Sequence, residues 1–232
     1  MKKFLSLILS IVMILSLSST VFAAENTEYQ EYTNLVDIGV LGDDITFEYW
    51  QALKTRESQL AKILEDCEEF SLVYDSSRAA TSYSMQAGDV LITNGTISSG
   101  LTGHSGIAIS SYSILHIAGP GKNPETTTLS KWITHYNAEG WTKIYRHSDS
   151  TVAKKAANWA EATYKDSDAE YVINMDLTST DKTYCSKLVW QAYYYGPDTH
   201  CANGPTVGVR LPYDLPSTIH DLSLVQTYEK TS

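Results

Sequence analysis

Four short β-type segments follow one another between Ala87 and Ser148 and constrain the fold most. They are AGDVLITNG, HSGIAIS, SILHIAG and WTKIYRHS, each rich in β-branched or aromatic residues and bounded by Gly, Ser, Asn or Pro. Consecutive short strands with tight links predict an antiparallel meander. The segment TTTLSKWITHYN, between the third and fourth strands, predicts a short helix or turn.

Helical patterns lie on both sides of this strand region. Apolar residues near helical period predict a long helix from Ile45 to Glu69, after a polar, irregular lead-in over 25–41. Thr151 to Tyr164 predicts another helix, capped by Ser150 or Asp149, and DLSLVQTYE near the end predicts a last edge strand. The predicted fold class is therefore α+β, one sheet with helices packed outside it.

Residues 1–23 have the features of a secretory signal peptide. Lys2 and Lys3 form a basic start, an apolar run extends from Phe4 to Leu17, and Val21-Phe22-Ala23 fits the small-x-Ala cleavage rule. The apolar run is short for a membrane span, although an uncleaved anchor is the alternative. The sequence predicts an exported, soluble protein that is secreted or associated with the cell wall.

The rest of the chain predicts one folded domain with an N-terminal extension. Residues 24–87 hold the lead-in and the long helix, and residues 88–232 form the domain that carries the chemistry. The formal net charge of −10 argues against nucleic acid or an anionic membrane as the main partner. A peptide or acyl substrate, peptidoglycan included, is the expected partner.

Three cysteines are present, so one thiol is left over if the other two pair. Export permits disulfides, and a bridge between Cys67 and Cys201 would leave Cys185 free. No CxxC or Cys/His spacing resembles a zinc site. We expect neither a metal nor a cofactor.

The segment DKTYCSKLVWQAYYY, residues 181–195, predicts an amphipathic helix with Cys185 in its first turn. Asp181 or Thr183 could serve as the N-cap. A thiol at this place faces unpaired backbone N–H groups and the positive end of the helix dipole, which lower its pKa and favour the thiolate. The alternative is a small buried cysteine that only packs.

His104 is the predicted base for this thiol, because imidazole has the pKa to carry its proton to a leaving group. In GHSGIAIS, strand alternation puts Gly106, Ala108 and Ser110 on the same face as His104. A helix that bears Cys185 could approach this small-residue face closely. The alternative is a solvated histidine at a strand end.

His116, in SILHIAG, is the predicted third group. A hairpin centred on Ser110 sets it opposite His104, and one centred on Tyr112 sets it opposite Ala108. Both registers put His116 on the face of His104, where it could fix the tautomer of the base. It could also be only a satisfied polar residue. The other four histidines, His135, His147, His200 and His220, are predicted to be surface residues.

With these segments in view, the chain resembles the circularly permuted branch of the NlpC-like, papain-like amidases, of the YycO and YiiX type. The motifs that carry the resemblance are AGDVLI, GHSGIAI, ILHIAGPG, TYCSKLVWQAYY and RLPYDLPST, in that order. The resemblance implies a small antiparallel barrel or sheet with the cysteine helix packed against it. It also implies Cys185 as nucleophile, His104 as base and His116 as orienting residue. Members often carry Glu at the third place, and acyltransferase-like relatives carry His.

The leading hypothesis is a secreted cysteine hydrolase that cleaves cell-wall peptide amides through a thioester. The backbone N–H of Cys185 is the expected oxyanion donor, with Tyr184, Ser186 and Ser105 around the oxyanion and substrate groove. A lipid or acyl transferase, or a thioesterase, with the same nucleophile is the first alternative. A non-catalytic binding module, in which the thiol is buried or disulfide-bonded, is the second.

Overall fold

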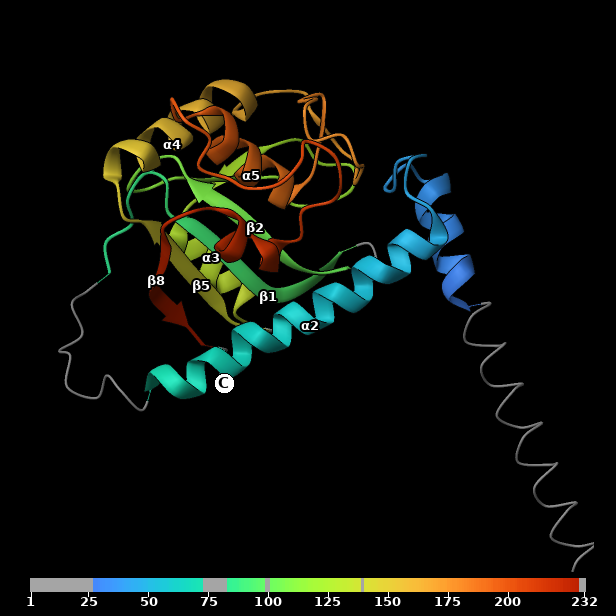
Figure 1. Cartoon of the computed structure of the whole chain (residues 1–232), viewed down its shortest axis with the longest axis horizontal. Helices are drawn as coiled ribbons and strands as arrows, with labels where there is room; N and C mark the ends of the chain where they lie inside the picture. The colour runs from blue at the N-terminus through green and yellow to red at the C-terminus, as the bar shows by residue number, and fades with distance from the viewer. Residues whose placement is uncertain (1–26, 73–82, 99–100, 139, 230–232) are drawn as a thin grey trace, which may run out of the picture.

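The computed structural model describes residues 27–72, 83–98, 101–138 and 140–229 (Figure 1). At its centre lies an antiparallel sheet of six strands in the order β4-β3-β2-β1-β5-β8. These strands are β1 (Val90–Ser98), β2 (Leu101–Ala108), β3 (Ile114–His116), β4 (Glu125–Thr127), β5 (Thr142–His147) and β8 (Leu222–Tyr228). The α+β class and the antiparallel meander are confirmed. The sheet is open, with β4 and β8 as its edges, so the closed form of the implied barrel is wrong.

Helices cover both faces of this sheet. The helix α3 (Leu129–Tyr136) packs on one face, where Trp132 shares a core with Leu91 of β1. The helices α4 (Ser150–Tyr164) and α5 (Cys185–Tyr195) lie side by side on the other face. Asp149 caps α4 through its carboxylate, as one of the two predicted caps. Strand alternation divides the apolar residues between the two cores, which fixes the face that each helix covers.

The long predicted helix is present as α2 (Phe47–Leu72), which runs past the side of the domain in Figure 1. The predicted irregular lead-in is wrong, because residues 27–37 form a helix. Tyr32 of that helix donates from its hydroxyl to the Ile45 carbonyl at 2.7 Å and packs against Trp50. Aromatic packing against α2 therefore orders a segment whose sequence looks polar.

A short parallel pair, β6 (Glu170–Tyr171) and β7 (Lys182–Thr183), precedes the cysteine helix. Because Thr183 is extended in this pair, α5 starts at Cys185 with Tyr184 as its N-cap. The predicted caps Asp181 and Thr183 are therefore wrong. After α5, a 3-10 turn η1 (Pro212–Asp214) and a short helix α6 (Leu215–Thr218) lead into β8.

One ion pair and two tyrosine hydrogen bonds anchor the start of the sheet. Asp89 is almost fully buried, accepts from Arg146 Nε at 2.7 Å and also accepts from the Tyr83 hydroxyl at 2.7 Å. The hydroxyl of Tyr193 on α5 donates to the Gly88 carbonyl at 2.6 Å. The Gly-Asp turn therefore has a structural role, holding β1 to β5 and to the cysteine helix.

Several predictions concern residues at the margins of this fold. The predicted signal peptide, residues 1–23, lies outside the described residues. Within the described segments, none of the helices combines the length and the apolar character that crossing a membrane requires. Cys201 is a free thiol whose S–H group donates a hydrogen bond to the Thr199 carbonyl. The predicted bridge from Cys201 to Cys67 is therefore not formed.

Candidate active site

The rings of His104 and His116 are hydrogen bonded to each other. His104 Nε2 lies 2.9 Å from His116 Nδ1, and both side chains are buried. One nitrogen must donate and the other accept, so each ring constrains the tautomer of its neighbour. The contact uses Nε2 of His104 and leaves Nδ1 as the nitrogen that could take up a proton.

The register of the hairpin brings the two rings together. Pairing of Ile107 with Leu115 centres the turn on Ser111, one residue away from either predicted centre. The second histidine therefore lies across from Gly106, diagonal to the first and on the same face. The predicted shared face is confirmed, and both predicted turn centres are wrong.

Aromatic side chains of α3 cover this pair. The ring of Trp132 stacks on His104 with centroids 5.2 Å apart, and the ring of Tyr136 lies 5.1 Å from it. Gly106 makes this possible, because a β-carbon there would come within 3.1 Å of Trp132 and 2.9 Å of Ile114. The small-residue face was predicted to receive the cysteine helix. It receives α3 instead, so that prediction is wrong.

Burial keeps both imidazoles neutral. It is the main cause that sets the pKa of His104 well below its usual value, with the charges of His116 and His135 acting in the same direction. The pKa of His116 is lowered to about 4, again chiefly by burial and then by His135. At neutral pH, neither ring carries a charge.

Cys185 is the first residue of α5 and is 6% exposed. Burial raises the pKa of its thiol above the usual value, while hydrogen-bonding groups of Ser105 and Ser186 act in the opposite direction. The predicted lowering of this pKa is wrong, because burial raises the pKa more than these hydrogen-bonding groups lower it. The resting protein therefore holds a neutral thiol and neutral imidazoles, not a thiolate–imidazolium pair.

The thiol approaches β2 from the face opposite the histidine pair. Ile107 packs in the same core as α5, whereas the next residue, Ala108, packs against α3. By strand alternation, Ser105 faces α5 and His104 faces α3. Across the described residues, no hydrogen bond joins the Cys185 thiol to His104.

Tyr136 connects the two halves of the site electrostatically. Its pKa is raised first by burial and second by the charge of a Cys185 thiolate. Its ring also lies against that of His104. Tyr136 therefore lies against the ring of His104 and also responds to a charge on Cys185.

Two predicted groove residues, Tyr184 and Ser186, position a neighbouring segment. The Tyr184 hydroxyl accepts from the Arg210 backbone N–H at 3.0 Å, and Ser186 Oγ donates to the Arg210 carbonyl at 2.7 Å. Because these residues flank Cys185, their bonds hold the segment 209–212 alongside the thiol.

The third predicted groove residue, Ser105, has a different environment. Its hydroxyl is fully buried and makes no hydrogen bond of ordinary geometry with the described residues. Leaving a buried hydroxyl without a partner costs about 1–3 kcal/mol. Since Ser105 adjoins the Cys185 thiol, its hydroxyl is available to a group bound there.

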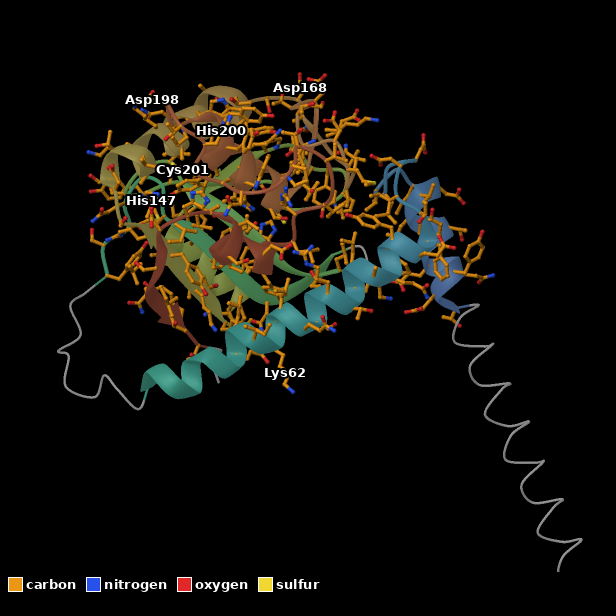
Figure 2. The ribbon with its side chains drawn as sticks, in the orientation of Figure 1. Lys62, His147, Asp168, Asp198, His200 and Cys201 are labelled. Atoms are coloured by element: carbon orange, nitrogen blue, oxygen red, sulfur yellow. The ribbon has the colours of Figure 1, made fainter. Side chains whose placement is uncertain are left out.

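The remaining histidines lie away from this site or at its edge. His135, His200 and His220 are exposed, as predicted. His147 is buried and stacks on Tyr193, so its predicted surface position is wrong. Figure 2 shows His147, His200 and Cys201 near α4 and α5, away from Lys62 on α2. Among the described side chains, no three of His, Cys, Asp or Glu gather as a metal site requires.

Lys187 was not singled out from the sequence, yet it is fully buried two residues after Cys185. Its Nζ donates to the Lys182 carbonyl at 2.6 Å and to Asn174 Oδ1 at 3.4 Å. Burial lowers the pKa of Lys187 to about 8. The side chain ties β7 to α5 and so helps to fix the start of the cysteine helix. The sequence signal for this role was a lysine within an otherwise apolar stripe of the cysteine helix.

Two cavities open onto the candidate residues from different sides. A polar cavity of about 600 Å³ reaches His116 and is lined by β4 and α3, including Glu125, Lys131 and His135. A second cavity of about 20 Å³ contains Cys185, and its walls are mostly apolar. The histidine pair and the Cys185 thiol therefore line separate cavities in the resting protein.

Comparisons with known proteins place the chain in a family. Residues 60–228, well over half of the chain, match the family described as "Lipoprotein N-acylation protein LnsA-like". The chain belongs to this LnsA-like family. Membership supports an enzyme of acyl chemistry, one of the alternatives drawn from the sequence. It does not single out hydrolysis of cell-wall amides.

Two individual proteins are similar to this LnsA-like chain. An uncharacterised 30.3 kDa protein from Bacillus thuringiensis is 36% identical over 158 residues, which are 63% of this chain and 58% of that protein. The chain thus spans little more than half the length of this relative. The crystal structure of the metalloprotein YiiX from Escherichia coli O157:H7 aligns with 63% of this chain and 99% of its own, at 16% identity and a TM-score of 0.46.

Proposed function

We propose that this LnsA-like protein is an acyltransferase that carries the acyl group as a thioester on Cys185 and passes it to an amine. The observation that carries the proposal is a mutually bonded pair of neutral histidines on β2 and β3, with the cysteine at the start of α5 against the other face of β2. The description of the family, lipoprotein N-acylation, supports an acyl chain as the group and an amine as the acceptor.

In the first step, the Cys185 sulfur attacks the carbonyl carbon of the acyl donor while its proton passes to His104 Nδ1. Because both groups are neutral at rest, His104 acts as a general base instead of stabilising a preformed thiolate. The missing thiol–imidazole hydrogen bond does not oppose this step, since such contacts commonly tighten only when substrate binds. The leaving group then takes the proton from His104.

His116 has the orienting role in this scheme. For Nδ1 of His104 to be the free acceptor, its Nε2 must carry the proton and donate to His116 Nδ1. When His104 becomes an imidazolium, this bond becomes charge-assisted and stabilises it. The stacked ring of Trp132 adds a further favourable contact with the transient cation.

The tetrahedral intermediates need donors for a negatively charged oxygen. The backbone N–H of Cys185 lies in the first turn of α5 and has no partner within the helix. The buried hydroxyl of Ser105, next to the thiol and without an ordinary hydrogen-bond partner, is our second donor.

In the second step, an acceptor amine attacks the thioester carbon and gives its proton to His104, which returns it to the departing thiolate. Acyl group and protons then balance, and no cofactor is required. Water in place of the amine gives hydrolysis, so a cysteine hydrolase is the second candidate. The narrow apolar cavity at Cys185 favours an acyl chain over a cell-wall peptide, which needs a wide polar groove.

The test supplies a labelled acyl donor and an amine acceptor, such as a lipopeptide with a free α-amino group, and separates acylated amine from free acid. We expect N-acylated peptide as the main product, and none from the Cys185→Ala variant. Free acid as the main product at saturating acceptor would favour the hydrolase. We also propose that residues 1–23 direct export of the protein, so that the reaction takes place outside the cytoplasm.

A further inference from the structure

The cavity beside Cys185 has one wall that comes from outside the domain. Its inner walls are Leu101 and Gly103 of β2, the start of α5 and the segment 209–212. Its outer wall includes Glu57, which is buried and belongs to α2. The family match begins at residue 60, so this part of α2 lies outside the matched region.

The cavity is small in the resting protein. Its volume of about 20 Å³ holds roughly one water molecule. An acyl thioester on Cys185 places its hydrocarbon chain directly next to the sulfur. The apolar side chains around the cavity suit such a chain, but the available volume does not. A wall must therefore move before a chain can enter.

Polar contacts tie α2 to the segment 209–214 beside the cavity. Arg56 Nη2 lies 2.7 Å from Asp214 Oδ1, and the Tyr49 hydroxyl accepts from the Val209 backbone N–H at 3.2 Å. The guanidinium is about half exposed, whereas the carboxylate of Asp214 is buried. When the pair opens, the guanidinium moves into water, while the buried carboxylate of Asp214 still accepts from the Leu211 backbone N–H at 3.3 Å.

The rest of α2 supports a local opening. Trp50 and Leu53 anchor its first half in the main core, while Glu57 is the last buried side chain up to Glu65. Beyond this point the described side chains are exposed or only partly buried, and Lys62 points away from the domain (Figure 2). The second half of α2 is therefore held at the margin of the core, by Leu60 and Leu64 and by the bond from Lys143 Nζ to the Leu64 carbonyl, and these contacts must part when it lifts.

We propose that α2 is the movable wall of an acyl-chain site: the hydrocarbon chain on Cys185 lies beneath α2, against Leu101 and Leu211, and enters when the Arg56–Asp214 pair opens. The proposal rests on the acyl chemistry proposed above, and it assigns the chain a place in the structure. Lid movements of this kind commonly gate an active site and exclude water from it.

Alkyl methanethiosulfonates of increasing chain length test this without a substrate. The Cys185 thiolate attacks the sulfenyl sulfur, forms a mixed disulfide with the alkylthio group and releases methanesulfinate. In a Cys67→Ser, Cys201→Ser background, we compare methyl and dodecyl reagents by intact mass. Arg56→Ala is expected to accelerate the dodecyl reaction at least about tenfold more than the methyl reaction. Tyr49→Phe is expected to have a smaller effect in the same direction.

Lys54→Ala is the matched control, because Lys54 lies on the same helix but pairs with Glu28 and Glu31. It is expected to leave both rates unchanged. Equal dodecyl rates in Arg56→Ala and Lys54→Ala overturn the proposal. Because Arg56→Ala could perturb folding, a second measurement uses protein in which α2 carries no substitution. Dodecyl labelling should speed amide hydrogen exchange over residues 56–65 relative to methyl labelling, and no difference contradicts the movable wall.

The two proposals fail separately. If α2 opens for dodecyl reagents but acyl donors never load Cys185, the movement of α2 is supported and acyl transfer is wrong. If acyl donors load Cys185 at the same rate with and without Arg56, acyl transfer stands and the gating role of α2 is wrong.

Discussion

His104 Nε2 and His116 Nδ1 lie 2.9 Å apart, on diagonal positions of the adjacent strands β2 and β3. This geometry leaves one nitrogen of the first ring for proton transfer and commits the other to orientation. The roles of the two histidines are therefore unequal, and substitutions should separate them.

Replacing His116 should affect the rate more than substrate binding. His116→Ala removes the acceptor for His104 Nε2 and is expected to lower kcat about 100-fold with KM nearly unchanged. His116→Asn keeps an acceptor oxygen and should recover at least about tenfold of this loss. Steady-state kinetics of acyl transfer checks both. Equal activity of the Ala and Asn variants would show that the hydrogen bond does not orient the base.

Stability should fall as the solution becomes acidic. The pKa of His116 is about 4 in the folded protein, against about 6.5 in the unfolded chain. Between these values only the unfolded state takes up the proton, so the free energy of unfolding falls by about 3 kcal/mol from pH 7 to pH 4. Urea unfolding at several pH values measures this. His116→Asn should reduce the slope, and a slope that stays the same in this variant would show that His116 is not its source.

Alkylation of the active thiol should be slow at neutral pH and rise towards alkaline pH. Iodoacetamide reacts with the thiolate, and burial raises the pKa of Cys185 above its usual value. Peptide mass mapping of the labelling rate from pH 6 to pH 10 follows this. A rate that is already maximal at pH 6 would indicate a preformed thiolate and contradict the general-base scheme.

Lys187 should stabilise the start of the cysteine helix. Lys187→Ala leaves the Lys182 carbonyl and the Asn174 amide oxygen without their buried donor, at a cost of about 1–3 kcal/mol. Lys182→Ala is the control, because it removes an exposed side chain and keeps the carbonyl. Denaturant unfolding of both variants compares them, and equal stabilities would refute this role.

The sequence predicts the order of the elements well, because local patterns determine them. The alternation in β1 and β2, the helical period of α2 and the carboxylate cap at Asp149 each depend on neighbours only a few residues away. The helix over 27–37 was missed, because its order comes from tertiary packing of Tyr32 on Trp50. Composition cannot reveal such a contact.

The shared face of His104 and His116 was predictable from strand alternation, but the electrostatics of the candidate site were not. The protonation of the Cys185 thiol depends on burial, which no local pattern reports. The approach of α3, not α5, to Gly106 likewise depends on which helix covers which face. Glu57 was missed because it lies far from Cys185 along the chain, and only folding brings the two residues to one cavity.

The most direct test of the account is the intact mass of the protein after brief exposure to an acyl donor. We predict one added acyl group on Cys185, released by neutral hydroxylamine, absent from Cys185→Ala and formed far more slowly by His104→Ala. An acyl group that still forms in Cys185→Ala, or one that His104→Ala acquires at the unchanged rate, would contradict the proposed thioester mechanism.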